Sequence, residues 1–165
     1  MRYLGIDPGS RITGYGCIHG PAGREPALIE AGVLRLTIQR GGERVGIADR
    51  LLELHQDMAG LLERLKPEAV AVESLFAHYK HPATAIAMGH ARGVILLAVR
   101  AAGLPLVELK PNAVKKYLTG HGHAAKGQMQ SAVRERLRLA AAPEPPDVAD
   151  AIAIAMCAAS RFALA

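Results

Sequence analysis

Short apolar or alternating stretches near the start of the chain predict three β-strands. They cover Arg2–Asp7, Arg11–His19 and Ala27–Thr37. Because only short turns rich in Gly, Pro and Ser separate them, we expect an antiparallel meander. Gly14 and Gly16, in the second stretch, would let another backbone approach that strand closely.

The pattern then changes to helical spacing. Over Gly41–Leu65, apolar side chains recur at steps of three and four residues, which predicts a long amphipathic helix. The apolar run Glu68–Glu73 follows. Because a helix crossover precedes it, this run should form a strand parallel to the first. A helix rich in small residues is expected over Ala83–Ala102, and a fifth strand over Leu104–Leu109.

Three more helices are expected before the end of the chain, over Pro111–Leu118, Gly127–Leu139 and Asp147–Phe162. With the preceding elements they give the order βββαβαβααα. This order predicts one α/β domain, residues 1–165, in which helices flank a five-stranded mixed sheet. A length of 165 residues is sufficient for a sizeable core.

Four acidic residues lie beside runs that should be buried. Asp7 and Glu73 each end an apolar strand, and Asp147 and Asp150 are three residues apart where an apolar helix begins. The spacing of the last two places them on one helix face. Four carboxylates at the edge of a core would repel one another unless a cation neutralised them. Hard oxygen ligands favour Mg²⁺ or Mn²⁺.

The charge distribution is compatible with a polyanionic partner. The chain has a formal net charge of +5 and a pI of about 9.5, and the segment from Lys110 to Arg138 contains seven basic residues and one acid. A basic protein with clustered carboxylates points to phosphodiester chemistry. Cys17 and Cys157 match no metal or redox spacing, so we expect buried free thiols. We see no signal peptide and no uncharged apolar stretch long enough to span a bilayer, so a soluble cytoplasmic protein without a membrane partner is expected.

Five motifs, in order along the chain, carry a resemblance to a known family. They are Gly-Ile-Asp-Pro-Gly-Ser-Arg-Ile-Thr-Gly-Tyr-Gly at 5–16, Ala-Val-Glu-Ser-Leu-Phe at 71–76, Ala-Arg-Gly-Val at 91–94, Val-Lys-Lys-Tyr-Leu-Thr-Gly-His-Gly at 114–122, and Asp-Val-Ala-Asp-Ala-Ile-Ala-Ile-Ala at 147–155. The chain closely resembles RuvC-type Holliday-junction resolvases from Met1 to about Phe162.

The resemblance implies a ribonuclease-H-like fold and a homodimer that nicks a four-way DNA junction symmetrically, in DNA recombination, repair and the SOS response. It implies that Asp7, Glu73, Asp147 and Asp150 are the catalytic and metal-binding residues, with Mg²⁺ or Mn²⁺ and two ions per site. Some members have His where this chain has Asp147. The family also implies RuvA–RuvB branch-migration partners.

DNA-binding residues follow in the same way. Family lysines match Lys115 and Lys126, and the family aromatic that contacts the junction matches Phe76, which could unstack a base. The following loop, residues 77–82, is less typical of the family. His121 and His123 lie in a basic loop, where they could contact phosphate, assist catalysis or simply be solvated. Arg134 and Arg138 are interpreted as a solvated helix face.

Three of the four acids also have a structural interpretation: Asp7 could be a turn residue, Asp147 a helix N-cap and Glu73 the partner of a lysine. Asp150 has no easy structural explanation on a helix that is otherwise apolar. Three other functions stay open: a ribonuclease-H-like enzyme acting on RNA or RNA–DNA hybrids, an ATPase of the actin and sugar-kinase type, and a non-catalytic junction-binding protein. A two-fold symmetric substrate favours a symmetric dimer. We expect its interface on the helix Ala83–Ala102, around Gly89.

Overall fold

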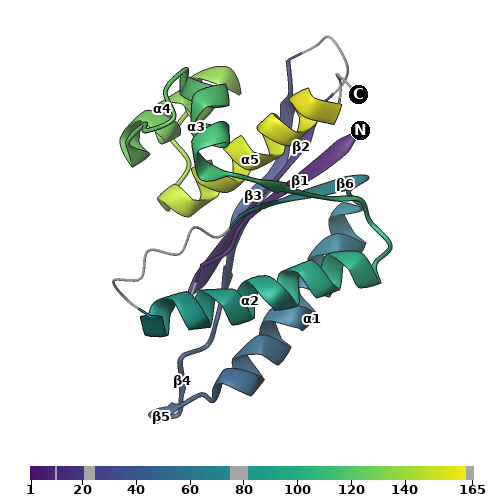
Figure 1. The fold of residues 1–165 in the computed structure, drawn as a ribbon, viewed down its shortest axis with the longest axis vertical. Helices are drawn as coiled ribbons and strands as arrows, with labels where there is room; N and C mark the ends of the chain where they lie inside the picture. The colour runs from purple at the N-terminus through teal and green to yellow at the C-terminus, as the bar shows by residue number, and fades with distance from the viewer. Residues whose placement is uncertain (10, 21–24, 75–81, 163–165) are drawn as a thin grey trace.

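A mixed five-stranded sheet forms the centre of the molecule (Figure 1). The structure is a computed structural model, and it describes residues 1–9, 11–20, 25–74 and 82–162. In spatial order its strands are β3 (Ala27–Arg35), β2 (Ile12–His19), β1 (Arg2–Asp7), β6 (Ala69–Glu73) and β7 (Leu106–Leu109). β1, β2 and β3 pair antiparallel, whereas β1, β6 and β7 pair parallel. The predicted meander and the predicted parallel strand are therefore confirmed.

Helices cover both faces of this sheet (Figure 1). One layer consists of α1 (Ile47–Leu65) and α2 (Pro82–Ala101), and the other of α3 (Pro111–Thr119), α4 (Lys126–Arg136) and α5 (Pro146–Phe162). Strand side chains alternate between the two layers. Ile6 and Val72 face the α1–α2 layer, and Ala71 faces α5.

The start of the first helix was predicted wrongly. Part of the segment before Ile47 forms a small two-stranded sheet, β4 (Gln39–Arg40) with β5 (Glu43–Arg44). Gly41 and Gly42 join these strands with φ values of +61° and +87°, a conformation that glycine adopts without strain and that tight hairpins require. The adjacent glycines are therefore a hairpin signal and not the first turn of a helix.

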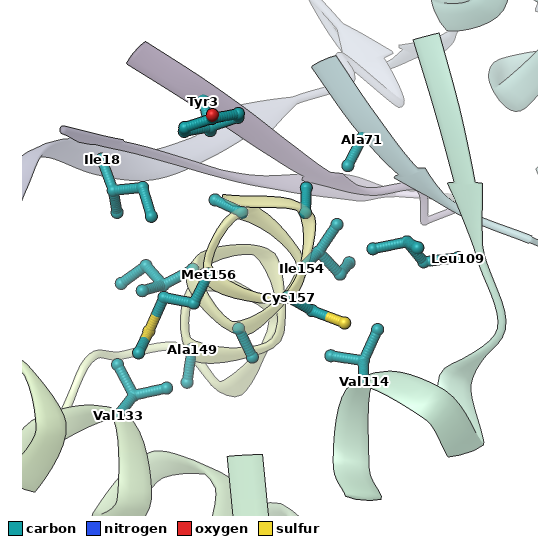
Figure 2. Packing of buried hydrophobic residues seen from close by; sticks show 14 of the residues in the cluster. Tyr3, Ile18, Ala71, Leu109, Val114, Val133, Ala149, Ile154, Met156 and Cys157 are labelled. Carbon is teal, nitrogen blue, oxygen red and sulfur yellow. The ribbon is translucent and has the colours of Figure 1, made fainter. Parts of the chain in front are cut away.

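Helix α5 is the central packing element of its layer (Figure 2). It lies so close to the sheet that a Cβ on Gly16 would come within 2.9 Å of the Ile152 backbone nitrogen, and one on Gly14 within 2.2 Å of the Asp147 carbonyl oxygen. The expected close approach at both glycines is confirmed. Cys17 and Cys157 are buried free thiols, as predicted.

Helix α2 packs on the α1 side through Ala91, Ile95, Ala98 and Val99. By length and composition it is the one helix among the described residues that could cross a membrane, with a mean hydropathy of 1.4 over its most apolar window, of which 22% is buried. From the sequence we expected no uncharged apolar stretch long enough for such a span, and α2 contains the charged residue Arg92. In the structure this arginine forms an ion pair with Glu108 of the sheet.

Candidate active site

Two of the predicted acids lie at neighbouring ends of parallel strands. Asp7 is the last residue of β1, and Glu73 is the last residue of β6. Ile6 pairs with Val72 in the parallel register. Asp7 and Glu73 are the next residues of the two strands, so they lie side by side at the same sheet edge. Because Ile6 and Val72 face α1 and α2, the alternation of side chains directs Asp7 and Glu73 to the α5 face.

The other two acids come from the first turns of α5. Asp147 lies in the first turn and Asp150 follows three residues later, so both project from one side of the helix. Gly14 pairs with Asp7 in the sheet and approaches the backbone of Asp147. The absence of a side chain at residue 14 thus lets the start of α5 lie directly over the end of β1.

Three of the four acids line a common cavity of about 240 Å³. Asp7, Glu73 and Asp150 line it together with Lys115 and Lys126. Its apolar wall consists of Pro111, Val114 and Met129. Asp147 is not part of the wall, although it is close enough for its charge to act on Asp7.

Burial and mutual repulsion make these carboxylates hard to ionise. Burial raises the pKa of Asp7 to about 8, and the charges of Glu73, Asp150 and Asp147 act in the same direction. Burial also raises the pKa of Glu73 to about 7, with a further contribution from Asp150. The pKa of Asp150 is raised chiefly by burial. A positive charge at this point would act against all three shifts, because it stabilises the ionised carboxylates.

The two lysines act on the carboxylates themselves. Lys126 lowers the pKa of Asp7 and Asp150, whereas Lys115 lowers that of Glu73 and Asp150. Their prediction as DNA-contacting residues stays a prediction. The structure adds that each lies in the wall of the carboxylate cavity, where a phosphate group would meet lysine and carboxylate at once.

The donor set fits a hard divalent cation, since carboxylate oxygens are the ligands that Mg²⁺ and Mn²⁺ prefer. Among the residues that the structure describes, no three acidic, His or Cys side chains are already arranged to enclose a metal ion. Binding would therefore require the carboxylates to turn inward within the cavity. A bound cation would offset the mutual repulsion of the acids that resists this approach.

The remaining predicted residues lie outside this cavity. His121 lines a separate hollow of about 510 Å³ with Thr119 and Gln128, and His123 is exposed. Phe76 and residues 77–81 lie outside the described part of the chain, so the role of this aromatic stays a prediction. Arg134 and Arg138 are exposed, as their interpretation as a solvated face requires.

A third hollow, of about 470 Å³, lies in the α1–α2 layer, on the opposite side of the sheet. Its wall is mostly apolar and includes His55, Leu62 and Ala98, with Glu63 as its one carboxylate. The acids of the candidate site are not among its residues, so it does not compete as the active site. Sequence reasoning assigned no role to Met129 beyond an apolar helix face, although this residue closes one wall of the carboxylate cavity.

Comparisons with known proteins identify the family of this chain. The sequence model of the family described as "Crossover junction endodeoxyribonuclease RuvC" matches residues 3–158. Two proteins of that name, from Rhodopirellula baltica and Chloroflexus aggregans, are 46% and 45% identical to this chain. The first alignment covers 93% of this chain and 83% of the relative, and the second covers 95% and 92%.

Solved structures show the same fold. RuvC of Thermus thermophilus, in complex with a Holliday junction substrate, superposes with a TM-score of 0.86 and 35% identity, over 99% of this chain and 96% of the other. The yeast mitochondrial Holliday junction resolvase Ydc2 has a TM-score of 0.70 at 15% identity, over 98% of this chain and 80% of the other. At that identity, the second match supports the fold alone.

Proposed function

Because this chain belongs to the RuvC family of crossover junction endodeoxyribonucleases, we propose that it resolves four-way DNA junctions by metal-dependent hydrolysis of phosphodiester bonds. The observation that carries the proposal is the cavity in which Asp7, Glu73 and Asp150 meet beside two lysines. Acids from two strands and a helix converge there although they are far apart in sequence. We further propose that residues 1–165 act as a single nuclease domain.

The metal would be Mg²⁺ or Mn²⁺, with two ions per site. Asp7, Glu73, Asp150 and Asp147 would hold the ions through their carboxylate oxygens. When bound, such ions polarise the scissile phosphate, activate the attacking water and stabilise the leaving 3′ oxygen. Asp147 does not line the cavity, so its role would require a change of side-chain conformation.

The protein residues would then have three tasks. The carboxylates, once ionised, bind cations and orient the water by accepting its hydrogen bonds. The ammonium groups of Lys115 and Lys126 attract the phosphate and partly offset the carboxylate charge. The apolar wall of Pro111, Val114 and Met129 excludes bulk water from one side, which strengthens these electrostatic interactions.

Junction binding would extend beyond the cavity. We propose that Lys115 and Lys126 contact backbone phosphates near the cut, and that His121 and His123, which lie outside the carboxylate cavity, contact the DNA backbone. Phe76 follows Glu73 by three residues in the sequence, which supports its role as the aromatic that unstacks a base at the junction centre.

A homodimer would place two such sites on the two-fold symmetric junction. Helix α2 supports this proposal, because Ile86 and Leu97 are 61% and 62% exposed. Gly89 and Gly93 lie on the same exposed side of the helix, and a Cβ on either would meet no neighbouring atom. An apolar surface with small residues at its centre suits the close approach of a second copy of α2.

The cellular setting is also proposed from the family. The protein would act in the cytoplasm on DNA recombination intermediates, with RuvA–RuvB as the branch-migration partner. This setting is consistent with the basic charge of the chain and with the pairing of Arg92 to the sheet, which keeps α2 part of the folded domain.

The proposal is tested with a labelled mobile four-way junction, a matched linear duplex and an RNA–DNA hybrid, each with Mg²⁺ or Mn²⁺. We expect paired symmetric nicks in the junction alone. Asp7→Asn should bind the junction and fail to cut it. Asp49→Asn, which changes an exposed acid in the first turn of α1, should cut at the wild-type rate.

Other outcomes favour the alternatives. Binding without cutting in either metal would indicate an architectural junction-binding protein and would contradict the proposed hydrolysis. Preferential cutting of the hybrid would place the chain among ribonucleases of the same fold. An actin-type ATPase would hydrolyse ATP, and its activity would not depend on the presence of a junction.

A further inference from the structure

Arg92 connects helix α2 to the strand end that carries Glu73. Its Nε donates a hydrogen bond to the backbone carbonyl oxygen of Glu73 at 3.3 Å. Its terminal nitrogen donates to the carboxylate of Glu108 on β7. The Arg92 side chain is only 16% exposed, so one guanidinium joins α2, β6 and β7 in a partly buried position.

This arginine lies on the opposite side of the sheet from the carboxylate cavity. Val72 pairs with Glu108 across the two parallel strands, and the Val72 side chain packs in the α1–α2 layer. Glu108 therefore projects toward α2 and Arg92, whereas Glu73, one residue after Val72, projects toward α5. The guanidinium thus holds the main chain of Glu73 from behind.

The effect of Arg92 on Glu73 is mechanical, through the backbone. The charged groups that act on the Glu73 carboxylate are Asp150 and Lys115, both on the cavity side. On the sheet side, the chain directly after Glu73 is held by Ser74, whose backbone nitrogen donates to the Leu109 carbonyl at 2.9 Å. Arg92 adds a second attachment, from the helix layer.

We propose that Arg92 is a positioning residue that holds the end of β6 so that the Glu73 carboxylate points into the metal-binding cavity. Through Arg92, the placement of Glu73 depends on α2, the helix on which the dimer surface is proposed. The inference rests on the proposed function, because it treats Glu73 as a metal-binding residue. It also gives a role to the Ala-Arg-Gly-Val motif at 91–94.

Groups that orient metal ligands without touching the metal typically contribute tenfold to a hundredfold to metal affinity or activity. We therefore expect Arg92→Ala to weaken Mn²⁺ binding to the DNA-free protein by about tenfold, as measured by isothermal titration calorimetry. The Mn²⁺ concentration that gives half-maximal junction cleavage should rise by the same factor, and junction affinity without metal should not change.

Two further variants separate positioning from general stability. Arg92→Lys keeps a donor that can reach the carbonyl and should recover part of the Mn²⁺ affinity, and it carries the test if Arg92→Ala does not fold. Glu108→Gln removes the ion pair and leaves the bond to Glu73, so its Mn²⁺ affinity should stay close to wild type.

The matched control is Arg100→Ala on the same helix. Arg100 also donates to a backbone carbonyl, that of Leu104 at 3.2 Å, but this contact is exposed and distant in the fold from the carboxylates. Its loss should leave Mn²⁺ affinity unchanged. All variants are compared well below their thermal midpoints, so that each is fully folded.

The outcomes are distinguishable. If wild-type protein binds Mn²⁺ and cuts junctions while folded Arg92→Ala and Arg92→Lys match it in both, the positioning role is wrong and the proposed function stands. Equal losses in Arg92→Ala and Arg100→Ala would also overturn it, since they would indicate a general effect on α2. If wild-type protein neither binds Mn²⁺ nor cuts, the proposed function fails and the inference fails with it.

Discussion

Asp7 is partly buried at the end of the central strand, and its ionisation works against folding. Its pKa is raised to about 8 from an ordinary value of 3.8, chiefly by burial and then by Glu73. Between these values the folded state retains a proton that the unfolded chain has released. Stability must therefore fall as the pH rises from the unfolded to the folded pKa, and it is fully present below the unfolded pKa.

Asp7→Asn should remove this pH dependence. In the metal-free protein we expect the variant to be more stable than wild type at about pH 8, by up to about 5 kcal/mol, and the difference should vanish near about pH 4. Urea denaturation with a chelator present, repeated at several pH values, measures this difference.

Added Mn²⁺ provides the complementary observation. It should raise the stability of wild type at about pH 8 and have much less effect on Asp7→Asn, because a bound cation takes over the role of the proton. Equal pH profiles for the two proteins without metal would contradict the assignment of Asp7 as the buried, proton-retaining acid. Asp49→Asn, at an exposed acid, should follow the wild-type profile.

Lys126 offers a second test at the residue scale. Its positive charge should attract the DNA phosphate and repel the metal ion, so its removal should affect junction affinity and Mn²⁺ affinity in opposite directions. Lys126 lowers the pKa of Asp7 and Asp150, so it also disfavours a cation beside them. For Lys126→Gln we expect equal or tighter Mn²⁺ binding without DNA. Junction affinity should fall, with the slope of log affinity against log salt reduced by about one.

The matched control for that substitution is Lys116→Gln, since Lys116 is exposed on α3 one residue after Lys115. It removes the same charge outside the cavity and should leave Mn²⁺ binding unchanged. Weaker Mn²⁺ binding in Lys126→Gln alone would show that this lysine supports the metal site by some route other than its charge.

At the scale of elements, the site depends on how closely α5 approaches the sheet. A Cβ on Gly5 would lie 2.1 Å from the carbonyl oxygen of Ala151 and 2.5 Å from the backbone nitrogen of Ala155. Neither atom can move without moving the helix. Since α5 also carries Asp147 and Asp150, a displacement of the helix would displace two of the four acids.

Gly5→Ala should therefore reduce both stability and activity. We expect a loss of about 2–3 kcal/mol in the free energy of unfolding, within the range for overpacked cores, and a large fall in cleavage rate at saturating metal. Gly60→Ala is the control. Nothing lies within 4 Å of a Cβ at Gly60, and in the interior of α1 this change should stabilise by about 0.5–1 kcal/mol. A wild-type cleavage rate in Gly5→Ala would contradict the dependence on α5.

Local patterns predicted the elements well because their signals are local. The apolar runs that end in Asp7 and Glu73 gave β1 and β6, and a crossover helix between them gave their parallel pairing. The glycine pair Gly41–Gly42 was misread because helical periodicity begins close behind it. The end of α4 was predicted at Leu139, but the helix ends at Arg136. Arg138 has a positive φ of 52°, and no glycine or asparagine in that stretch indicates such a conformation.

The convergence of the acids was predictable in part. Parallel neighbouring strands must bring Asp7 and Glu73 to one edge, whereas the docking of α5 depends on contacts between distant residues. The sequence marked Gly14 and Gly16 as places of close approach without saying what approaches them. That Asp147 stays out of the cavity wall, and that Lys115 and Lys126 join it, follows from helix packing alone and could not be read from spacing.

At the scale of the whole molecule, the two faces of the sheet have different tasks. Helices α3, α4 and α5 lie on one face of the sheet and α1 and α2 on the other (Figure 1). The first face holds the carboxylate cavity, and α2 presents an exposed apolar stripe. Residues 86, 89, 93 and 97 recur at steps of three and four and are all exposed, so they form one continuous stripe. Arg92 is the contact through which this layer reaches Glu73.

Gly89→Trp should break a dimer built on this stripe. A Cβ at residue 89 has no neighbouring atom within 4 Å in its own chain, so the folded protomer should keep its stability. A second copy of α2 could no longer approach closely. We expect sedimentation to shift from dimer to monomer. On a four-way junction the variant should make single nicks, because the two cuts would no longer be held in one complex. Gly60→Trp, an equally bulky change at an open position on α1, should leave both properties unchanged. A dimeric Gly89→Trp that still makes paired nicks would place the interface elsewhere, and the exposure of Ile86 and Leu97 would then need a different partner.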